Sequence, residues 1–290
     1  MDRKKIIGSV CGIAAAVCYG TNPLGALKLY GEGMTTGSVL FWRFGLAWLI
    51  IALVMAVRRE SPKVSWPQFR TLSALGLLFI VSSLTLYLSF MHMPAGVAST
   101  ILFTYPVMTA VIMSLFFKER MRLVTVVSVL LSLVGVLLLY WGDGTNALSL
   151  LGVLLVLASA LSYALYIIVM DKGSLQMSSF KINFYVLAYC AVGMLVYSLL
   201  SGAPMQVPHG GTSWFYVMWL AFVPAIFALV LMVYAAKYVG STATAIMGAM
   251  EPLTAVLIGV FVFGEPFGPR LALGIALILA AVAFIIFAKR

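Results

Sequence analysis

Residues 243–265 read ATAIMGAMEPLTAVLIGVFVFGE, and residues 98–119 read ASTILFTYPVMTAVIMSLFFKE. Both stretches are almost wholly apolar, and in both a proline precedes a glutamate by 13 residues: Pro252 precedes Glu265 as Pro106 precedes Glu119. A repeated spacing within one chain predicts a repeated structural unit. We therefore expect two halves, residues 1–145 and residues 146–290.

The composition around these stretches is that of a membrane protein. Of the 290 residues, 63% are hydrophobic and 9% charged, and the mean hydropathy is +1.12, so too few polar residues are present to cover a water-soluble globule. A bilayer core about 30 Å thick needs about 20 apolar residues per helix. The chain divides into ten such runs: Ile6–Leu27, Thr36–Val57, Thr71–Met91, Ala95–Phe117, Val124–Tyr140, Leu148–Met170, Asn183–Ser201, Trp214–Ala236, Thr242–Phe263 and Leu271–Ala288. We predict an all-α polytopic fold.

The basic residues give an orientation to these spans. Of the 18 Lys and Arg residues, 15 fall in the termini and alternate loops of one side, only Lys28 and Arg270 fall on the other side, and Arg43 lies inside the second span. Cytoplasmic loops carry the excess of Lys and Arg, so both termini are predicted to be cytoplasmic. Because each half has five spans, an odd number, the second half enters the membrane from the opposite face. The repeat is thus expected to be inverted, a plan that recurs in secondary transporters.

The composition also argues against other classes of protein. The net charge of +10 comes from short clusters between apolar runs, which orient membrane helices and do not predict nucleic-acid binding. Cys11, Cys18 and Cys190 show no C-x-x-C spacing, so neither a metal site, a disulfide framework nor any cofactor is expected. The apolar run after Met1–Lys5 is too long for a signal peptide and is read as a retained first helix. The spans contain neither paired carboxylates nor a metal-binding motif, so the sequence does not predict an enzyme.

These features together resemble the EamA family of the drug/metabolite transporter superfamily. The resemblance rests on the doubled proline and glutamate spacing and on Phe41-Trp42-Arg43-Phe44 in the second span, and it extends over the whole chain. It implies ten helices around a central cavity lined by spans 1, 3, 4, 6, 8 and 9, with spans 5 and 10 peripheral. Bacterial members commonly export amino acids and related metabolites across the inner membrane, and the chain looks most similar to YddG-type exporters of aromatic amino acids.

The resemblance leaves several questions of function open. Drugs, nucleosides or other metabolites are alternative substrates, and a channel, a scaffold without transport activity or a membrane-embedded enzyme are rival classes. The expected partners are a small-molecule substrate and the lipid bilayer, and the chain is expected to be a monomer or a weak homo-oligomer. The two halves differ chemically, since the first has Tyr105 where the second has Glu251, and Arg43 has no basic counterpart in the seventh span. The binding site should therefore be asymmetric.

Candidate site residues lie on the spans that the family assigns to the cavity. We expect the substrate to contact Tyr19, Asn22, Tyr87, Phe103, Tyr105, Tyr163, Tyr166, Phe227 and Glu251. Aromatic rings suit a flat, amphipathic substrate, although any one ring can equally belong to bundle packing. Asn22 could instead make a hydrogen bond between helices. Arg43 is expected to extend its side chain to the outer interface.

Two further kinds of residue stand out within the spans. Pro23, Pro106, Pro224 and Pro252 each remove one helical hydrogen bond and free a carbonyl, so kinks or hinges are expected there, unless the prolines serve packing alone. Glu251 is the only carboxylate deep in an apolar run. A carboxylate at that depth must be protonated, paired or exposed to water, so it is expected to bind a substrate ammonium or a transported proton, or to make a structural hydrogen bond.

Overall fold

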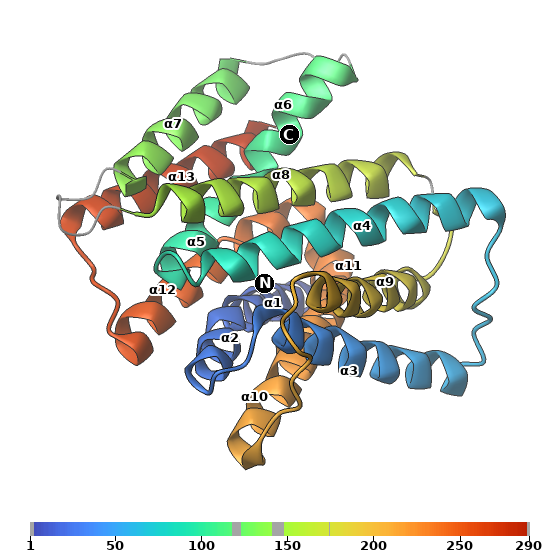
Figure 1. Cartoon of the computed structure of the whole chain (residues 1–290). Coiled ribbons are helices and arrows are strands. Elements are labelled where there is room, and N and C mark those ends of the chain that lie inside the picture. The colour runs from blue at the N-terminus through green and yellow to red at the C-terminus, as the bar shows by residue number, and fades with distance from the viewer. Residues whose placement is uncertain (1–2, 118–122, 141–147, 174, 289–290) are drawn as a thin grey trace.

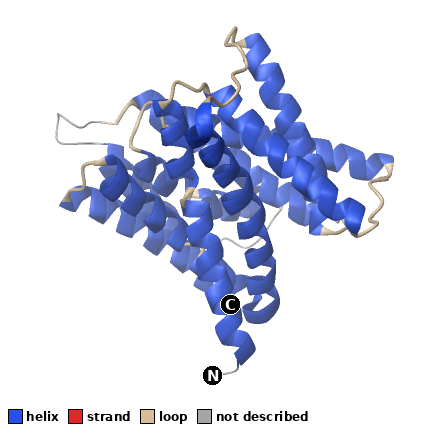
Figure 2. Cartoon of the chain, turned by 90° about the horizontal axis from the view of Figure 1, so that it is seen from below, coloured by secondary structure: helices blue, strands red, loops and turns tan. Residues whose placement is uncertain are grey.

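The described part of this computed structural model comprises residues 3–117, 123–140, 148–173 and 175–288. Within these ranges the chain forms helices and connecting loops, and no strand (Figures 1 and 2). The helices are α1 (Arg3–Gly20), α2 (Asn22–Gly31), α3 (Thr36–Val57), α4 (Trp66–Ser89), α5 (Ala95–Leu102), α6 (Tyr105–Phe116), α7 (Leu123–Tyr140), α8 (Leu150–Lys172), α9 (Ser179–Leu200), α10 (Gly210–Phe222), the π-helical η1 (Val223–Phe227), α11 (Ala228–Met247), α12 (Met250–Phe263) and α13 (Pro269–Ala288).

These elements make up the ten predicted spans. Eight helical stretches are long and apolar enough to cross a membrane, and the shorter apolar helices Met250–Phe263 and Pro269–Phe284 account for the last two. The predicted all-α, ten-helix membrane fold is therefore confirmed for the described residues. The predicted boundary between the two halves, at residues 145 and 146, lies outside them.

Several spans are not single helices. The first span consists of α1 and α2, and the fourth consists of α5 and α6, separated at Phe103 and Thr104. The ninth span begins within α11, after Gly240 (φ 83°, ψ 164°), and is interrupted again at Gly248 and Ala249 before α12. A residue with a side chain is strained at that φ, which explains why a glycine separates the eighth span from the ninth.

The helices pack in pairs that respect the internal repeat. The fifth and tenth spans lie side by side as α7 and α13 (green and red in Figure 1), the second and seventh as α3 and α9, and the fourth and ninth as α5 and α12. The first span packs on the eighth, α1 on α11, as the sixth packs on the third, α8 on α4. Exchanging the two halves leaves this set of pairs unchanged, which is the arrangement expected of two repeats related by a pseudo-two-fold axis.

Small residues allow close approach within these pairs. A Cβ added to Gly135 of α7 would lie 3.0 Å from the carbonyl oxygen of Gly274 in α13, and one added to Gly274 would lie 3.1 Å from that of Gly135. Gly8 and Gly12 of α1 face α11 in the same way, at Tyr238 and Met247. In a bilayer no water is released between apolar helices, so such close backbone contact is a main source of helix association.

The starts of α3 and α9 each make hydrogen bonds with a loop from the other half. At α3, the backbone N–H of Thr35 donates to Oε1 of Gln206 at 2.6 Å, and the N–H of Gln206 donates to Ser38 Oγ at 2.9 Å. At α9, the Ser178 hydroxyl donates to the Glu60 carboxylate, and Lys181 Nζ donates to the Lys63 carbonyl oxygen at 2.6 Å. These contacts satisfy polar groups at helix ends and join the halves on both faces of the bundle.

Candidate functional site

A cavity of about 400 Å³ lies among the spans in the middle of the bundle. Its wall is formed by Ala16, Tyr19, Asn22, Arg43, Phe79, Ser82, Ser83, Leu86, Tyr87, Leu102, Tyr105, Tyr163, Met232, Ala236, Thr244, Gly248 and Glu251. These residues come from spans 1, 2, 3, 4, 6, 8 and 9. They include every span that the family resemblance implies, and the second span is added through Arg43.

The interrupted helices end at this cavity. Leu102 closes α5 and Tyr105 opens α6, while Gly248 and Glu251 flank the break before α12, and all four line the wall. Pro106 and Pro252 follow these breaks directly, Pro23 follows the break at Thr21, and Pro224 lies in the π-helical turn. The structure thus places an irregular stretch of backbone at each of the four prolines. Such backbone is tolerated at membrane depth where it lines a cavity or is enclosed by protein.

Aromatic rings form one side of the wall. Tyr105 and Tyr163 meet edge to face with their ring centroids 4.7 Å apart, and Tyr166 stacks behind Tyr163 at 5.8 Å with an interplanar angle of 4°. Phe79 stands next to Tyr163 at 6.3 Å. Because each of these rings packs against another ring, the ring faces directed into the cavity have a fixed orientation before any ligand binds.

Arg43 corrects the sequence-based interpretation. Its side chain does not reach the outer interface but is only 8% exposed and lines the cavity. Nη1 donates to the Tyr87 hydroxyl oxygen at 2.5 Å, and the guanidinium carbon lies 5.2 Å from the ring centroid of Phe44 and 5.4 Å from that of Tyr87. Ring faces and a hydroxyl replace part of the hydration that the interface would have supplied, so the cation stays within the bundle.

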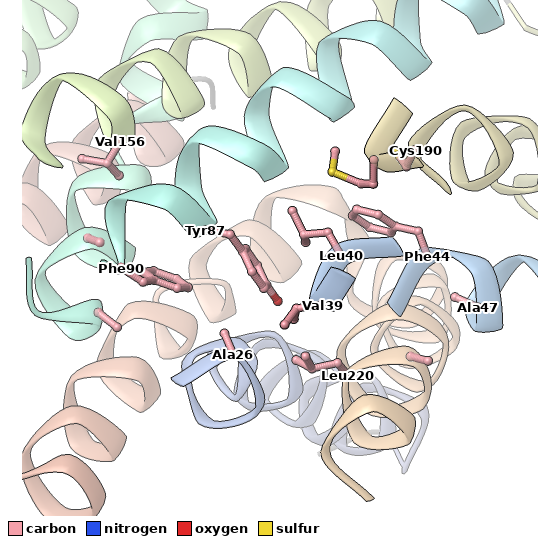
Figure 3. Close-up of a cluster of buried hydrophobic side chains, with 14 of the residues drawn as sticks. Ala26, Val39, Leu40, Phe44, Ala47, Tyr87, Phe90, Val156, Cys190 and Leu220 are labelled. Carbon is pink, nitrogen blue, oxygen red and sulfur yellow. The ribbon is translucent and has the colours of Figure 1, made fainter. Parts of the chain in front are cut away.

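Tyr87 joins this cation to α2, the second helix of the first span. Its hydroxyl is directed from α4 toward α3, close to Val39 (Figure 3), and also approaches Asn22 Oδ1 at 3.4 Å. The Asn22 side-chain amide in turn donates to the Tyr19 carbonyl oxygen at 2.8 Å, which is the carbonyl that Pro23 leaves free. Asn22 therefore lines the cavity, satisfies the helix break and makes the contact between helices that was the alternative expectation, through Tyr87. Its contact with the substrate stays a prediction.

Glu251 lies across the break from Gly248, in the first turn of α12. Its backbone N–H donates to the Gly248 carbonyl oxygen at 3.0 Å, and its half-buried side chain lines the cavity. The start of a helix favours a negative charge, which lowers the cost of placing a carboxylate here. Among the described residues, the one ion pair within 4.0 Å joins Lys172 and Asp171, so Glu251 and Arg43 do not pair with each other.

The predicted site residues are divided by the structure into two groups. The cavity brings together Tyr19, Asn22, Tyr87, Tyr105, Tyr163 and Glu251. Tyr166 supports Tyr163 from behind, and Phe103 is buried against Val107, Ala281 and Val282. Phe227 is 47% exposed on η1 and does not line the cavity, because the π-helical turn shifts the register of side chains after Pro224.

The wall also contains polar and aromatic residues that the sequence did not mark as site residues: Arg43, Phe79, Ser82, Ser83 and Thr244. A usable signal existed for Arg43, since an ionisable residue inside a span is by default a candidate functional residue. No such signal marks the others, because serines, threonines and phenylalanines are common throughout membrane helices and only the packing decides which of them face a cavity.

Comparison with known proteins assigns the family. The sequence profile of the EamA-like transporter family matches residues 6–141 and residues 150–287. The chain belongs to the EamA-like transporter family. This EamA-like chain is 28% identical over 275 residues to an uncharacterized transporter of Archaeoglobus fulgidus, covering 95% of this chain and 94% of that protein. It is 24% identical over 267 residues to the uncharacterized transporter YdfC of Bacillus subtilis, covering 91% and 86%.

A solved structure supports the fold. A protein with a solved crystal structure superposes on the EamA-like chain with a TM-score of 0.66 at 19% identity, covering 96% of this chain and 95% of that one. At that identity the likeness concerns the fold alone. The family and the apolar helices establish a multi-pass membrane transporter.

Proposed function

We propose that this EamA-like transporter exports small amphipathic metabolites across the bacterial inner membrane, with aromatic and hydrophobic amino acids as the favoured substrates. The observation that carries the proposal is the cavity wall, where Tyr19, Tyr105 and Tyr163 share one enclosure with Glu251. Ring faces accept the flat side chain of such a substrate, and a carboxylate accepts its ammonium group.

The size of the cavity agrees with a small substrate. Its volume of about 400 Å³ lies toward the lower end of the range of about 300–1,000 Å³ typical of small-molecule sites. The wall combines apolar and aromatic side chains with polar and charged ones, and such a mixture suits an amphipathic molecule.

Alternating access is the mechanism that the pairing of the two halves supports. The cavity lies between the halves, and the fourth and ninth spans are each interrupted beside it. In the proposed cycle, the breaks before Pro106 and Pro252 act as hinges while the two halves rock about the cavity. Pro106→Ala or Pro252→Ala should then reduce transport more than membrane insertion, and an equal loss of both would assign the prolines to packing.

The experiment that tests the proposed site is Glu251→Gln in proteoliposomes given a panel of amino acids. Glutamine keeps the shape and hydrogen-bonding capacity of the side chain but cannot ionise. We expect the variant to lose most transport from about pH 5.5 to about pH 8, because it neither pairs with an ammonium group nor carries a proton. Wild-type transport by the variant over that range would exclude both roles for Glu251.

A further inference from the structure

The cavity contains a buried cation that has no counter-ion among the described residues. Arg43 is 8% exposed, and no described carboxylate lies within 4.0 Å of it. Burying a charge is costly unless an opposite charge or several hydrogen bonds compensate for it. If this position served packing alone, an apolar residue would fill it without the cost of burying a charge. The presence of a cation therefore points to a negatively charged binding partner.

The contacts of Arg43 hold it in place without neutralising it. Tyr87 accepts one hydrogen bond, and the rings of Phe44 and Tyr87 lie against the guanidinium, but all of these groups are neutral. A guanidinium carries five N–H donors, and its Nε–H finds no acceptor within the described part of the chain. The environment therefore fixes the orientation of the group and leaves its charge available.

Glu251 brings a negative charge into the same cavity, and it does not form an ion pair with Arg43. Arg43, from α3, and Glu251, from α12, are the two charged residues of the wall, and every other described lining residue is neutral. Two opposite charges that share an enclosure without pairing form a template for a molecule that carries both charges at a fixed separation.

We propose that Arg43 binds the carboxylate of the substrate while Glu251 binds its ammonium group, so that the transporter selects zwitterions over amines and over carboxylic acids. This inference rests on the proposed function and deepens it by adding Arg43 to the substrate-contacting residues. Tyr87 is a positioning residue, because its hydroxyl accepts a hydrogen bond from the guanidinium and thereby fixes the orientation of that group. An arginine recognises a carboxylate through two parallel N–H donors, which a lysine cannot reproduce.

The test compares two competitors in proteoliposomes that take up labelled L-phenylalanine. L-phenylalanine amide keeps the ring and the ammonium group but lacks the carboxylate. In the wild type we expect the amide to compete at least about tenfold more weakly than unlabelled L-phenylalanine, since a site built for a polar group rejects an analogue that lacks it. Arg43→Gln should bring the two competitors close to equality, and Tyr87→Phe should reduce the preference only in part.

Arg58→Gln is the matched control. Arg58 follows the C-terminal end of the same helix and also lies over an aromatic ring, Phe180 at 5.0 Å, but it does not line the cavity. Its variant should keep the wild-type preference. If Arg43→Gln fails to fold, the melting temperature of the wild type is measured with each competitor instead. L-phenylalanine should raise this temperature, and L-phenylalanine amide should not.

The outcomes separate this inference from the proposed function. If the wild type carries L-phenylalanine but does not distinguish it from the amide, or if a folded Arg43→Gln keeps the preference, then Arg43 is structural and only the inference is lost. If the wild type carries no amino acid at all, both the proposed function and the inference are overturned.

Discussion

The carboxylate of Glu265 caps the N-terminus of α5. Its Oε1 accepts a hydrogen bond from the backbone N–H of Ala95 at 2.7 Å, and its Oε2 accepts one from the N–H of Gly96 at 3.3 Å. The contact joins the loop after the ninth span to the beginning of the fourth. Gly264 turns the chain back at φ 67°, and a Cβ on Gly259 would lie 2.1 Å from Oε2. The repeated glutamate thus has a structural role in the second half, while its counterpart Glu119 lies outside the described residues.

Removing this cap should destabilise the protein. Glu265→Ala leaves the N–H groups of Ala95 and Gly96 without their acceptors, and losing a helix cap costs about 1 kcal/mol. Thermal unfolding in detergent measures the effect. Asp171→Asn is the control, since that carboxylate is exposed and pairs with the neighbouring Lys172. A melting temperature for Glu265→Ala equal to that of the control would show that the cap contributes nothing.

The same carboxyl should make stability depend on pH. Burial raises the pKa of Glu265, and the N–H groups of Ala95 and Gly96 oppose the rise without cancelling it. Because the pKa of an unfolded glutamate is about 4.3, folding favours the protonated form. This contribution is present below about pH 4 and is lost as the pH rises through the folded-state pKa. The melting temperature of the wild type should therefore fall relative to that of Glu265→Gln as the pH rises from about 4 to about 7, and parallel profiles would contradict this.

Aromatic residues inside and outside the cavity should behave differently. Tyr163→Ala removes a ring from the wall and the support that Tyr105 receives from it, so we expect the KM for aromatic amino acids to rise by about 2- to 10-fold, as for loss of one stacking contact. Phe227→Ala, on η1, should leave KM unchanged because that ring does not line the cavity. Equal effects of the two variants would argue against this cavity as the binding site.

Cysteine labelling in intact cells tests the orientation of the spans. His209→Cys, in the loop before α10, should react with a membrane-impermeant reagent from outside, whereas Lys63→Cys, in the loop before α4, should react only after permeabilisation. The physical reason is the excess of Lys and Arg on the side of Lys63. A cysteine at Asn146, in the loop between the fifth and sixth predicted spans, should label from the same side as His209→Cys; that loop lies outside the described residues. The reverse labelling pattern would refute the predicted cytoplasmic termini.

The sequence predicts the spans better than it predicts the site. Hydropathy and basic loops locate ten spans because the bilayer imposes length and charge on each of them separately. Prolines mark where the helices are interrupted, since a missing N–H acts locally. The faces of Phe227 and Arg43 were not predictable in this way. The π-helical turn changes the direction of the Phe227 side chain. Contacts with Tyr87, 44 residues further along the chain, keep the Arg43 side chain inside the bundle.

Substrate counterflow tests most directly whether this chain is a carrier of small amphipathic amino acids. Proteoliposomes are loaded with unlabelled L-phenylalanine and diluted into a trace of the labelled compound. A carrier that alternates between two faces exchanges the labelled for the unlabelled compound. We therefore expect a transient accumulation of label above the outside concentration, which is absent from empty liposomes and strongly reduced in Glu251→Gln. Label that only equilibrates, or that accumulates equally well with Glu251→Gln, would contradict transport through this cavity.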